Sequence, residues 1–202
     1  MPSPGGRRKA LGRGSGLRKR GWKGRAKIIR LLLLDVDGVL TDGQLAFDGA
    51  GQEIKFFHIR DGQGIRLLQQ AGIKVGIVTG RRSKAVDFRA RELGVDLVFQ
   101  KVRDKAQALE AILRKENLQA EQVCYVGDDL VDLAVLSCVG LAVAVADAAP
   151  EVKDLAHYTT RFPGGRGAVR EVCEKILKTQ GKWEKILEKY RPDADRDRSS
   201  RH

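Results

Sequence analysis

The sequence predicts an α/β fold built on a parallel sheet. After residue 26, apolar runs of strand length alternate with longer segments of helical periodicity, and this alternation is typical of βαβ units. The first apolar run consists of four leucines, residues 31–34, and ends directly in acidic and glycine residues. So short an apolar run, bounded by turn residues, is typical of a buried parallel strand. We therefore expect a Rossmann-like parallel sheet with helices on both faces.

The individual elements follow from the same patterns. Five apolar runs are predicted as strands: residues 28–35, 73–78, 97–99, 123–126 and 141–145. Five segments of helical spacing are predicted as helices: residues 64–70, 83–93, 105–116, 130–136 and 168–178. One insertion breaks the alternation, because residues 44–47 and 53–59 flank a turn at residues 48–51. This pattern predicts a β-hairpin, which we expect to act as a flap in place of a cap domain.

The positive charge of the chain is concentrated at its N-terminal end. The 202 residues carry a formal net charge of +12. Residues 1–30 hold eleven Lys and Arg residues and no acidic residue, whereas residues 31–190 hold 23 of each sign. We expect residues 1–26 to form a disordered basic leader and residues 27–180 to form one folded domain, with its flap at about 44–59. Residues 181–202 are expected to be a C-terminal tail.

The leader has several interpretations: a flexible tail, a segment that binds nucleic acid or anionic membrane, or sequence upstream of the true start codon. It lacks the apolar core of a secretory signal, and no stretch of the chain approaches the ~18 apolar residues of a membrane-spanning helix. Cys124, Cys138 and Cys173 lack metal-ligand spacing and lie among apolar residues. This pattern predicts reduced thiols in a cytoplasmic protein. Because no stretch could span a bilayer, we expect no membrane among the partners of the folded domain.

Polar side chains stand where the predicted strands end. In chain order they are Asp35 and Asp37, Thr79, Lys105, and Asp128 and Asp132. Parallel strands bring their carboxyl ends to one edge of the sheet, where open α/β sheets bind ligands. Acidic groups gathered there repel each other unless a cation joins them. The set offers oxygen ligands for Mg²⁺ and donors for phosphoryl oxygens, and the chain lacks the glycine-rich loops of triphosphate and dinucleotide sites.

These residues form four motifs, Asp35-x-Asp37, Thr79, Lys105 and Gly127-Asp128-x-x-x-Asp132. Over residues 28–180 they resemble the motifs of the haloacid dehalogenase-like phosphatase superfamily. The resemblance implies that Asp35 is the nucleophile and forms an aspartyl-phosphate. Asp37 is implied to protonate the leaving alkoxide and then to act as base on the hydrolytic water. Thr79 and Lys105 are implied to hold the phosphoryl oxygens.

The same resemblance implies a magnesium site. Its ligands would be the Asp35 carboxylate, the Asp37 backbone carbonyl and Asp128, and Asp132 would support the site from nearby. The chemistry is consistent with these residue types, because a carboxylate can attack an anionic phosphate only when positive charge cancels their repulsion.

Within this superfamily, four segments are most similar to the small-cap branch: residues 35–43, 55–65, 127–132 and 164–171. In that branch they most resemble the phosphatases of 3-deoxy-D-manno-octulosonate 8-phosphate. These act in lipopolysaccharide sugar synthesis, which implies the cytoplasm of a Gram-negative bacterium. The resemblance implies a homotetramer whose hairpins pack into a central barrel and whose neighbouring subunits complete each site. It places four residues near the small sugar-acid substrate: Arg60, Asp61, Arg81 and Arg166. The chain departs from the family at Lys101, where glycine is usual, at Ala149, where histidine is frequent, and at His58, where asparagine is common.

The spacing of the motifs along the chain also favours an oligomer, independently of the resemblance. Asp37 and Thr79 are 42 positions apart, and Thr79 and Lys105 are 26 apart. These intervals leave no room for a covering domain beyond the hairpin and one helix–strand unit. A bare site would admit water and discriminate poorly among phosphate esters, so we expect a second subunit to wall it.

Three other functions are considered. A phosphatase for nonulosonate 9-phosphates would use the same chemistry. A polynucleotide phosphatase would use the basic leader to hold nucleic acid, but the balanced charge of the rest of the chain argues against nucleic acid as a partner. A non-catalytic assembly module is the third, and the presence of all four motifs argues against it.

Overall fold

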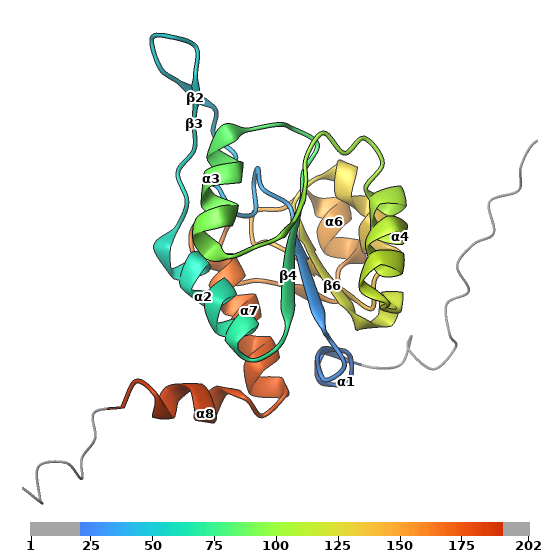
Figure 1. Cartoon of the computed structure of the whole chain (residues 1–202). Helices are drawn as coiled ribbons and strands as arrows, with labels where there is room; N and C mark the ends of the chain where they lie inside the picture. Colours follow the sequence, from blue (N-terminus) through green and yellow to red (C-terminus); the bar gives the residue numbers. More distant parts are fainter. Residues whose placement is uncertain (1–20, 192–202) are drawn as a thin grey trace, which may run out of the picture.

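The structure is a computed structural model that describes residues 21–191. It contains a six-stranded parallel sheet with helices on both faces and a separate two-stranded antiparallel hairpin (Figure 1). This architecture confirms the predicted fold class. Residues 1–20 of the predicted leader and residues 192–202 of the predicted tail lie outside the described residues.

The sheet has the strand order β5-β4-β1-β6-β7-β8. The strands are β1 Leu31–Leu34, β4 Lys74–Val78, β5 Leu97–Phe99, β6 Val123–Gly127, β7 Leu141–Ala144 and β8 Tyr158–Thr159. Every residue of β1 is buried, because β4 and β6 flank the strand and helices cover both faces. The chain first winds from β1 towards β5 and then returns to β6 on the other side. The carboxyl end of β1 is therefore the switch point at which open α/β sheets bind ligands.

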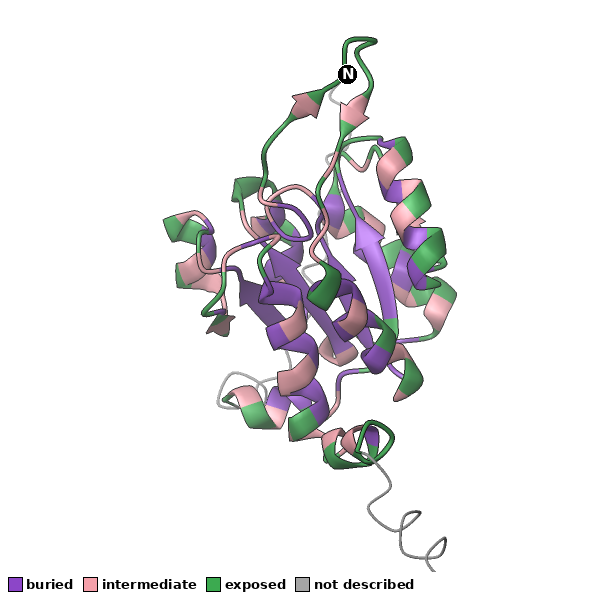
Figure 2. Cartoon of the chain, turned by 90° about the vertical axis from the view of Figure 1, so that its left-hand side faces the viewer, coloured by how far each residue is buried: buried purple, intermediate pink, exposed green. Residues whose placement is uncertain are grey.

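The helices form two layers, one on each side of the sheet (Figure 1). One layer holds α2 Ile59–Gln70, α3 Lys84–Leu93 and α7 Ala168–Thr179. The other holds α4 Lys105–Glu116, α5 Leu133–Leu136 and α6 Pro150–Leu155. The remaining helical segments are α1 Trp22–Ala26, η1 Ala120–Gln122, η2 Leu130–Asp132 and α8 Trp183–Glu188. Helices α2 and α7 pack side by side, and the buried residues form one core between the two layers (Figure 2).

The boundary expected for the disordered leader is wrong at its end. Residues 22–26 form α1, which packs against α7 and β7. The Trp22 indole Nε1 donates to Thr179 Oγ1 at 3.1 Å, and the buried Arg25 guanidinium donates to the Gly140 carbonyl at 2.6 Å. These long-range contacts order a segment whose composition alone indicated disorder. Helix α8, with Ile186 buried, similarly lies within the predicted tail.

The hairpin consists of β2 Ala46–Phe47 and β3 Glu53–Ile54 and projects beyond the carboxyl edge of the sheet (Figure 1). In its turn, the Asp48 carboxylate accepts from the amides of Ala50 and Gln52 at 2.9 and 2.7 Å. The paired region is short, so side chains nearer the base of the hairpin must hold it against the domain. Among the described residues, no helix combines the length and the apolar content needed to cross a bilayer.

Candidate active site

Three acidic residues and one lysine meet at the carboxyl end of β1. Lys105 Nζ lies 2.7 Å from Asp35 Oδ2 and 2.7 Å from Asp132 Oδ1. Carboxylate oxygens of Asp35, Asp128 and Asp132 lie within 4.8 Å of one another. The four side chains come from the end of β1, the start of α4 and the loop after β6, so residues almost 100 positions apart form one cluster.

Asp132 connects the members of this cluster through its two carboxylate oxygens. One of its carboxylate oxygens accepts from the Tyr125 hydroxyl at 2.8 Å and pairs with Lys105, and the other accepts from the amides of Asp128 and Asp129. A β-carbon at Gly127 would lie 2.6 Å from this carboxylate, so only glycine allows so close an approach. Asp132 is fully buried and its oxygens are already occupied by these donors. It therefore positions Lys105 and the loop after β6.

Asp35 and Asp128 carry more negative charge than the cluster neutralises. Burial raises the pKa of Asp35 to about 6, although Lys105 partly opposes this shift. Burial, followed by repulsion from Asp35 and Asp132, raises the pKa of Asp128 to about 7. Among the described residues, no group donates a hydrogen bond to the Asp128 carboxylate. A hard divalent cation such as Mg²⁺ would supply the missing positive charge, so this donor set fits a metal site.

Asp37 faces the hairpin. Its carboxylate pairs with Lys55 and lies 3.6 Å from Arg81 Nε. Glu53 joins the two cations, at 3.2 Å from Lys55 Nζ and 2.7 Å from Arg81 Nη2. The Lys55 side chain is only 2% exposed. This network fastens the base of the hairpin to the loop after β1.

The motifs did not point to Glu53 or Lys55 as part of the site, although the sequence around them contains a signal. The two charged residues alternate with Ile54 and Phe56, which are 42% and 72% exposed. On an extended segment, alternate side chains point to opposite sides. The charged side of this segment faces the domain and the apolar side faces outward, which is the reverse of the usual pattern.

Thr79 directly follows β4, the strand next to β1, and is buried. Its amide donates to the Phe99 carbonyl at 2.9 Å, and its hydroxyl oxygen accepts from the Arg81 amide at 3.3 Å. The hydroxyl proton remains available to an incoming oxygen.

The structure separates the four residues expected near a substrate. Arg81 lies at the site, whereas Arg60 and Arg166 are exposed on the domain surface, and Arg166 Nη2 is 3.4 Å from Asp42 Oδ2. Asp61 is buried and accepts from two amides at the start of α7, those of Gly167 at 3.2 Å and Arg170 at 2.7 Å. Asp61 thus caps α7 and holds it against α2, a role that its sequence position did not indicate.

The structure describes all three positions at which the chain departs from the family. Lys101 has a φ of +58°, a left-handed conformation that glycine adopts without strain and a lysine adopts at a cost of about 1 kcal/mol. The Ala149 amide donates to the Asp128 carbonyl at 2.7 Å, so this position supports the acidic loop through its backbone. His58 Nδ1 lies 3.9 Å from Asp61 Oδ2 and has no hydrogen-bond partner among the described residues.

Gly38 provides the first test of the site. Its φ is +84°, and a β-carbon there would overlap the Asp128 carboxylate. We expect Gly38→Ala to displace that carboxylate and weaken divalent-cation binding by about 10- to 100-fold in titration calorimetry. Gly49→Ala is the matched control, because no atom lies within 4 Å of a β-carbon at this hairpin turn. Equal affinities for the two variants would contradict the position assigned to Asp128.

The parallel sheet, its hairpin and the carboxylate–lysine cluster after β1 define a haloacid dehalogenase-like hydrolase. A profile of that family, described as haloacid dehalogenase-like hydrolase, matches residues 97–171. The 3-deoxy-D-manno-octulosonate 8-phosphate phosphatase of Yersinia pestis is 51% identical over 160 residues, which cover 79% of this chain and 86% of that protein. The phosphatase of the same name from Escherichia coli strain K12 is 49% identical over 158 residues, covering 78% and 84%.

Solved structures agree with these relatives. The phosphatase of Moraxella catarrhalis, crystallised with a magnesium ion, a phosphate ion and a KDO molecule, has a TM-score of 0.82 and 39% identity, covering 84% of this chain and 97% of that one. The Yersinia pestis crystal structure has a TM-score of 0.79, covering 80% and 88%. The chain therefore belongs to the family of the 3-deoxy-D-manno-octulosonate 8-phosphate phosphatases, which confirms the resemblance seen in its motifs.

Proposed function

We propose that this protein hydrolyses 3-deoxy-D-manno-octulosonate 8-phosphate to the free sugar acid and inorganic phosphate, with Mg²⁺ as its cofactor. The observation that carries the proposal is the meeting of Asp35, Lys105 and Asp128 at the switch point of the sheet, in a chain about half identical to phosphatases of that name. Ester hydrolysis of this kind forms part of lipopolysaccharide precursor synthesis, and three free cysteines suit a reducing cytoplasm.

In the proposed reaction, Asp35 attacks the phosphorus atom and displaces the sugar alkoxide, which leaves an aspartyl-phosphate. The Val36 amide donates to Asp35 Oδ1 at 2.7 Å and fixes the carboxylate, so one oxygen is held while the other faces Lys105. Lys105 and Thr79 then hold phosphoryl oxygens. Because the substrate is anionic, the ammonium group lowers the repulsion that opposes the attack.

Asp37 is proposed to protonate the departing alkoxide and then to take a proton from the water that hydrolyses the aspartyl-phosphate. Its carboxylate pairs with Lys55 at the base of the hairpin and lies 3.6 Å from Arg81 Nε in the loop after β4. A substrate phosphate that draws these cations away would release the Asp37 carboxyl group from both ion pairs. Asp37 would then act as the acid in the first step and as the base in the second.

Asp35, Asp128 and the Asp37 carbonyl are proposed to hold the metal, which would supply positive charge to the phosphoryl group. Asp132 is proposed to support the site by positioning Lys105 and the acidic loop.

The metal-free protein should be destabilised by Asp128. The pKa of this carboxyl is raised from 3.8 to about 7 by burial and by the neighbouring carboxylates. The folded state therefore holds the proton more tightly than the unfolded state, and ionisation costs stability as the pH rises from 3.8 through about 7. In EDTA at pH 8 we expect Asp128→Asn to raise the free energy of unfolding by about 1–2 kcal/mol, a value reduced for partial exposure.

Denaturant unfolding at pH 4 and pH 8 measures this effect. The gain should shrink at pH 4, and Mg²⁺ should raise the midpoint of the unsubstituted protein but not that of the variant. Asp129→Asn is the control, because Asp129 is an exposed neighbour whose side chain caps η2 through the Leu130 amide at 2.7 Å. A loss of stability for Asp128→Asn at pH 8 would contradict the excess of negative charge that we assign to the cluster.

We propose that arginines at the rim select the sugar acid, since a guanidinium pairs well with a carboxylate. Arg81 is the nearest candidate to Asp37, and Arg60 and Arg166 are proposed to reach the substrate at the rim of the site. Asp61 was expected to join them, and its contacts support a structural role instead.

A phosphate-release screen over sugar phosphates tests the proposed substrate. We expect the highest kcat/KM on 3-deoxy-D-manno-octulosonate 8-phosphate, above that on a nonulosonate 9-phosphate. A higher value on the nonulosonate would transfer the same chemistry to the alternative substrate. Absence of Mg²⁺-dependent release from every sugar phosphate would overturn the enzymatic proposal.

We propose further that the hairpins of four copies pack together in a homotetramer whose neighbouring subunits wall the site. Large apolar side chains of the hairpin and its base are at least 42% exposed, which marks an interaction surface: Leu45, Phe47, Ile54 and Phe56. We expect Phe56→Asp to dissociate the assembly in light scattering and to lower selectivity among phosphate esters. Phe88→Asp, on the exposed side of α3, is the control. A selective monomer would refute this arrangement.

A further inference from the structure

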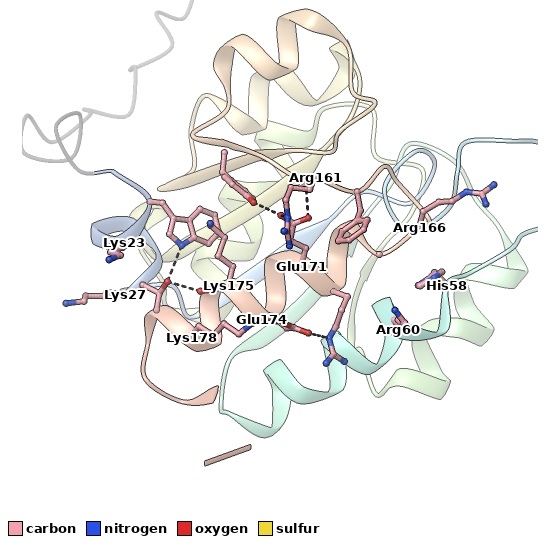
Figure 3. Close-up of a pocket in the computed structure, with 16 residues that line it drawn as sticks. Lys23, Lys27, His58, Arg60, Arg161, Arg166, Glu171, Glu174, Lys175 and Lys178 are labelled. Atoms are coloured by element: carbon pink, nitrogen blue, oxygen red, sulfur yellow. Dashed lines mark hydrogen bonds and ion pairs between the residues drawn. The ribbon is translucent and has the colours of Figure 1, made fainter. Parts of the chain in front are cut away.

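A second concave site lies away from the carboxylate cluster. It is an open groove of about 1070 Å³ along α7, bounded by α1, by the start of α2 and by the loop after β8 (Figure 3). Neither Asp35, Lys105 nor Asp128 lines it. We refer to it as the basic groove, because its lining holds eight Lys and Arg residues and only two acidic residues.

The two acidic residues are neutralised within the groove. Glu171 pairs with Arg161 at 3.4 Å, and Glu174 pairs with Arg170 at 2.6 Å and with Lys178 at 2.9 Å. The remaining cations are therefore in excess. Lys23 in α1, Lys27 at the end of α1 and Arg60 in α2 belong to this excess. None of the three has an ion-pair partner among the described residues.

The excess charge is spread along the groove. Lys23 and Lys27 stand at one end, and Arg60 and Arg166 stand at the other (Figure 3). Helix α7, which forms the floor between them, has 12 residues and so spans about 18 Å. A single phosphate could contact only one end of such an array. The distribution favours an extended ligand with several anionic groups along its length.

Aromatic surface lies among these cations. The Trp22 and Tyr158 rings pack with centroids 4.9 Å apart, and Lys175 Nζ lies 5.1 Å and 4.3 Å from them. Basic groups interleaved with aromatic rings are typical of surfaces that bind single-stranded nucleic acid. A membrane is a poorer match, because the cations line a concave groove rather than a flat or convex face.

The sequence that precedes α1 carries the same charge. Residues 1–20 contain seven Lys and Arg residues and no acidic residue, and they precede α1, whose Trp22 and Lys23 line the groove. The balanced composition of residues 31–190 argued against nucleic acid as a partner, but that balance conceals a separation of charge in space. One face of α7 collects positive charge, while the acidic cluster lies at the carboxyl edge of the sheet.

We propose that the basic groove binds a linear chain of phosphate groups, and that single-stranded nucleic acid supplies it. The ligand would run along α7, with its phosphates on the lysines and arginines of the groove. The test of this site uses Lys23, Lys27 and Lys175, which have no part in the proposed phosphatase chemistry. Arg60 and Arg166, at the other end of the groove, are also proposed to contact the phosphatase substrate.

Fluorescence anisotropy with a labelled 12-nucleotide single strand tests the proposal on the full chain. The groove variant replaces three lysines by glutamine, Lys23, Lys27 and Lys175. The control variant makes the same change at three lysines outside the groove, Lys84, Lys115 and Lys153, so both lose equal charge and both keep the leader. We expect the groove variant to bind about 10- to 100-fold more weakly at 0.1 M salt, with a salt slope smaller by about 2.

Phosphatase activity on a small substrate should stay unchanged in the groove variant, which verifies that it is folded. Equal affinities and slopes for the two variants would overturn the groove as the binding site, as would undetectable binding to the unsubstituted protein. Inorganic polyphosphate is the competing arm. One outcome is that polyphosphate displaces the labelled strand when both supply the same concentration of phosphate groups. That result would support binding of a phosphate chain in the groove, but it would overturn single-stranded nucleic acid as the ligand.

Discussion

Replacing Asp35 by asparagine should abolish Mg²⁺-dependent phosphate release. An amide cannot form the phosphorus–oxygen bond of the proposed aspartyl-phosphate, so the covalent route is lost rather than slowed. The substitution should leave the fold intact, because the amide oxygen of the new side chain can still accept from the Val36 amide, as Asp35 Oδ1 does at 2.7 Å. It also removes a carboxylate whose pKa burial raises to about 6.

The measurement is phosphate release at saturating substrate and Mg²⁺, combined with a search for labelled phosphate on the protein after a rapid acid quench. The unsubstituted protein should trap label and Asp35→Asn should trap none. Asp129→Asn serves as the control, because it changes the same functional group at an exposed position near the site. Residual turnover of more than a few per cent in Asp35→Asn would exclude Asp35 as the nucleophile.

Replacing Lys105 by alanine should lower kcat by about 10²–10³, equivalent to about 3–4 kcal/mol of transition-state stabilisation. Burial opposes the charge of this lysine, but Asp35 and Asp132 outweigh burial and raise its pKa above the usual value. The ammonium group is therefore charged at every pH at which the enzyme would work. Its loss removes the donor proposed for the phosphoryl oxygens and leaves two carboxylates unneutralised.

Steady-state kinetics and thermal unfolding, measured on the same samples, separate the loss of the phosphoryl donor from the loss of stability at the buried site. Lys105→Met preserves most of the side-chain volume, so it should reproduce the loss in kcat with less disturbance of the buried site. Lys115→Met, near the far end of α4, should leave kcat unchanged. Equal small losses for Asp35→Asn and Lys105→Ala would contradict the distinct roles given to the two residues.

Much of the fold was predictable because local patterns determine it. The leucines of β1 indicated a strand buried on both faces, and the four motifs stand where strands end, so the parallel sheet itself brings Asp35, Lys105 and Asp128 together. Residues that act through contacts distant in sequence were harder to predict. Lys55 closes an ion pair with Asp37 only when the hairpin folds back over the loop after β1.

Asp61 has a structural contact that its local sequence does not indicate. Its place beside Arg60, in a segment that resembles the family, suggested a ligand contact, but its carboxylate caps a helix that begins more than 100 residues later. The packing of α2 against α7 decides this role, and no local pattern reports on that packing. The same holds for α1, where a basic, glycine-containing segment becomes helical because Trp22 and Arg25 find partners on α7 and beside β7.

The sequence by itself determined the class of fold, the identity of the chemical groups and the edge of the sheet at which they gather. These depend on periodicity and on residue type, which are local properties of the chain. Only the tertiary structure decided which carboxylates pair with Lys105, which carboxylate has no such partner and is left for a cation, and where the positive charge of a balanced domain collects. These outcomes depend on distances between residues far apart in the chain, and electrostatic energy follows distance and burial rather than composition.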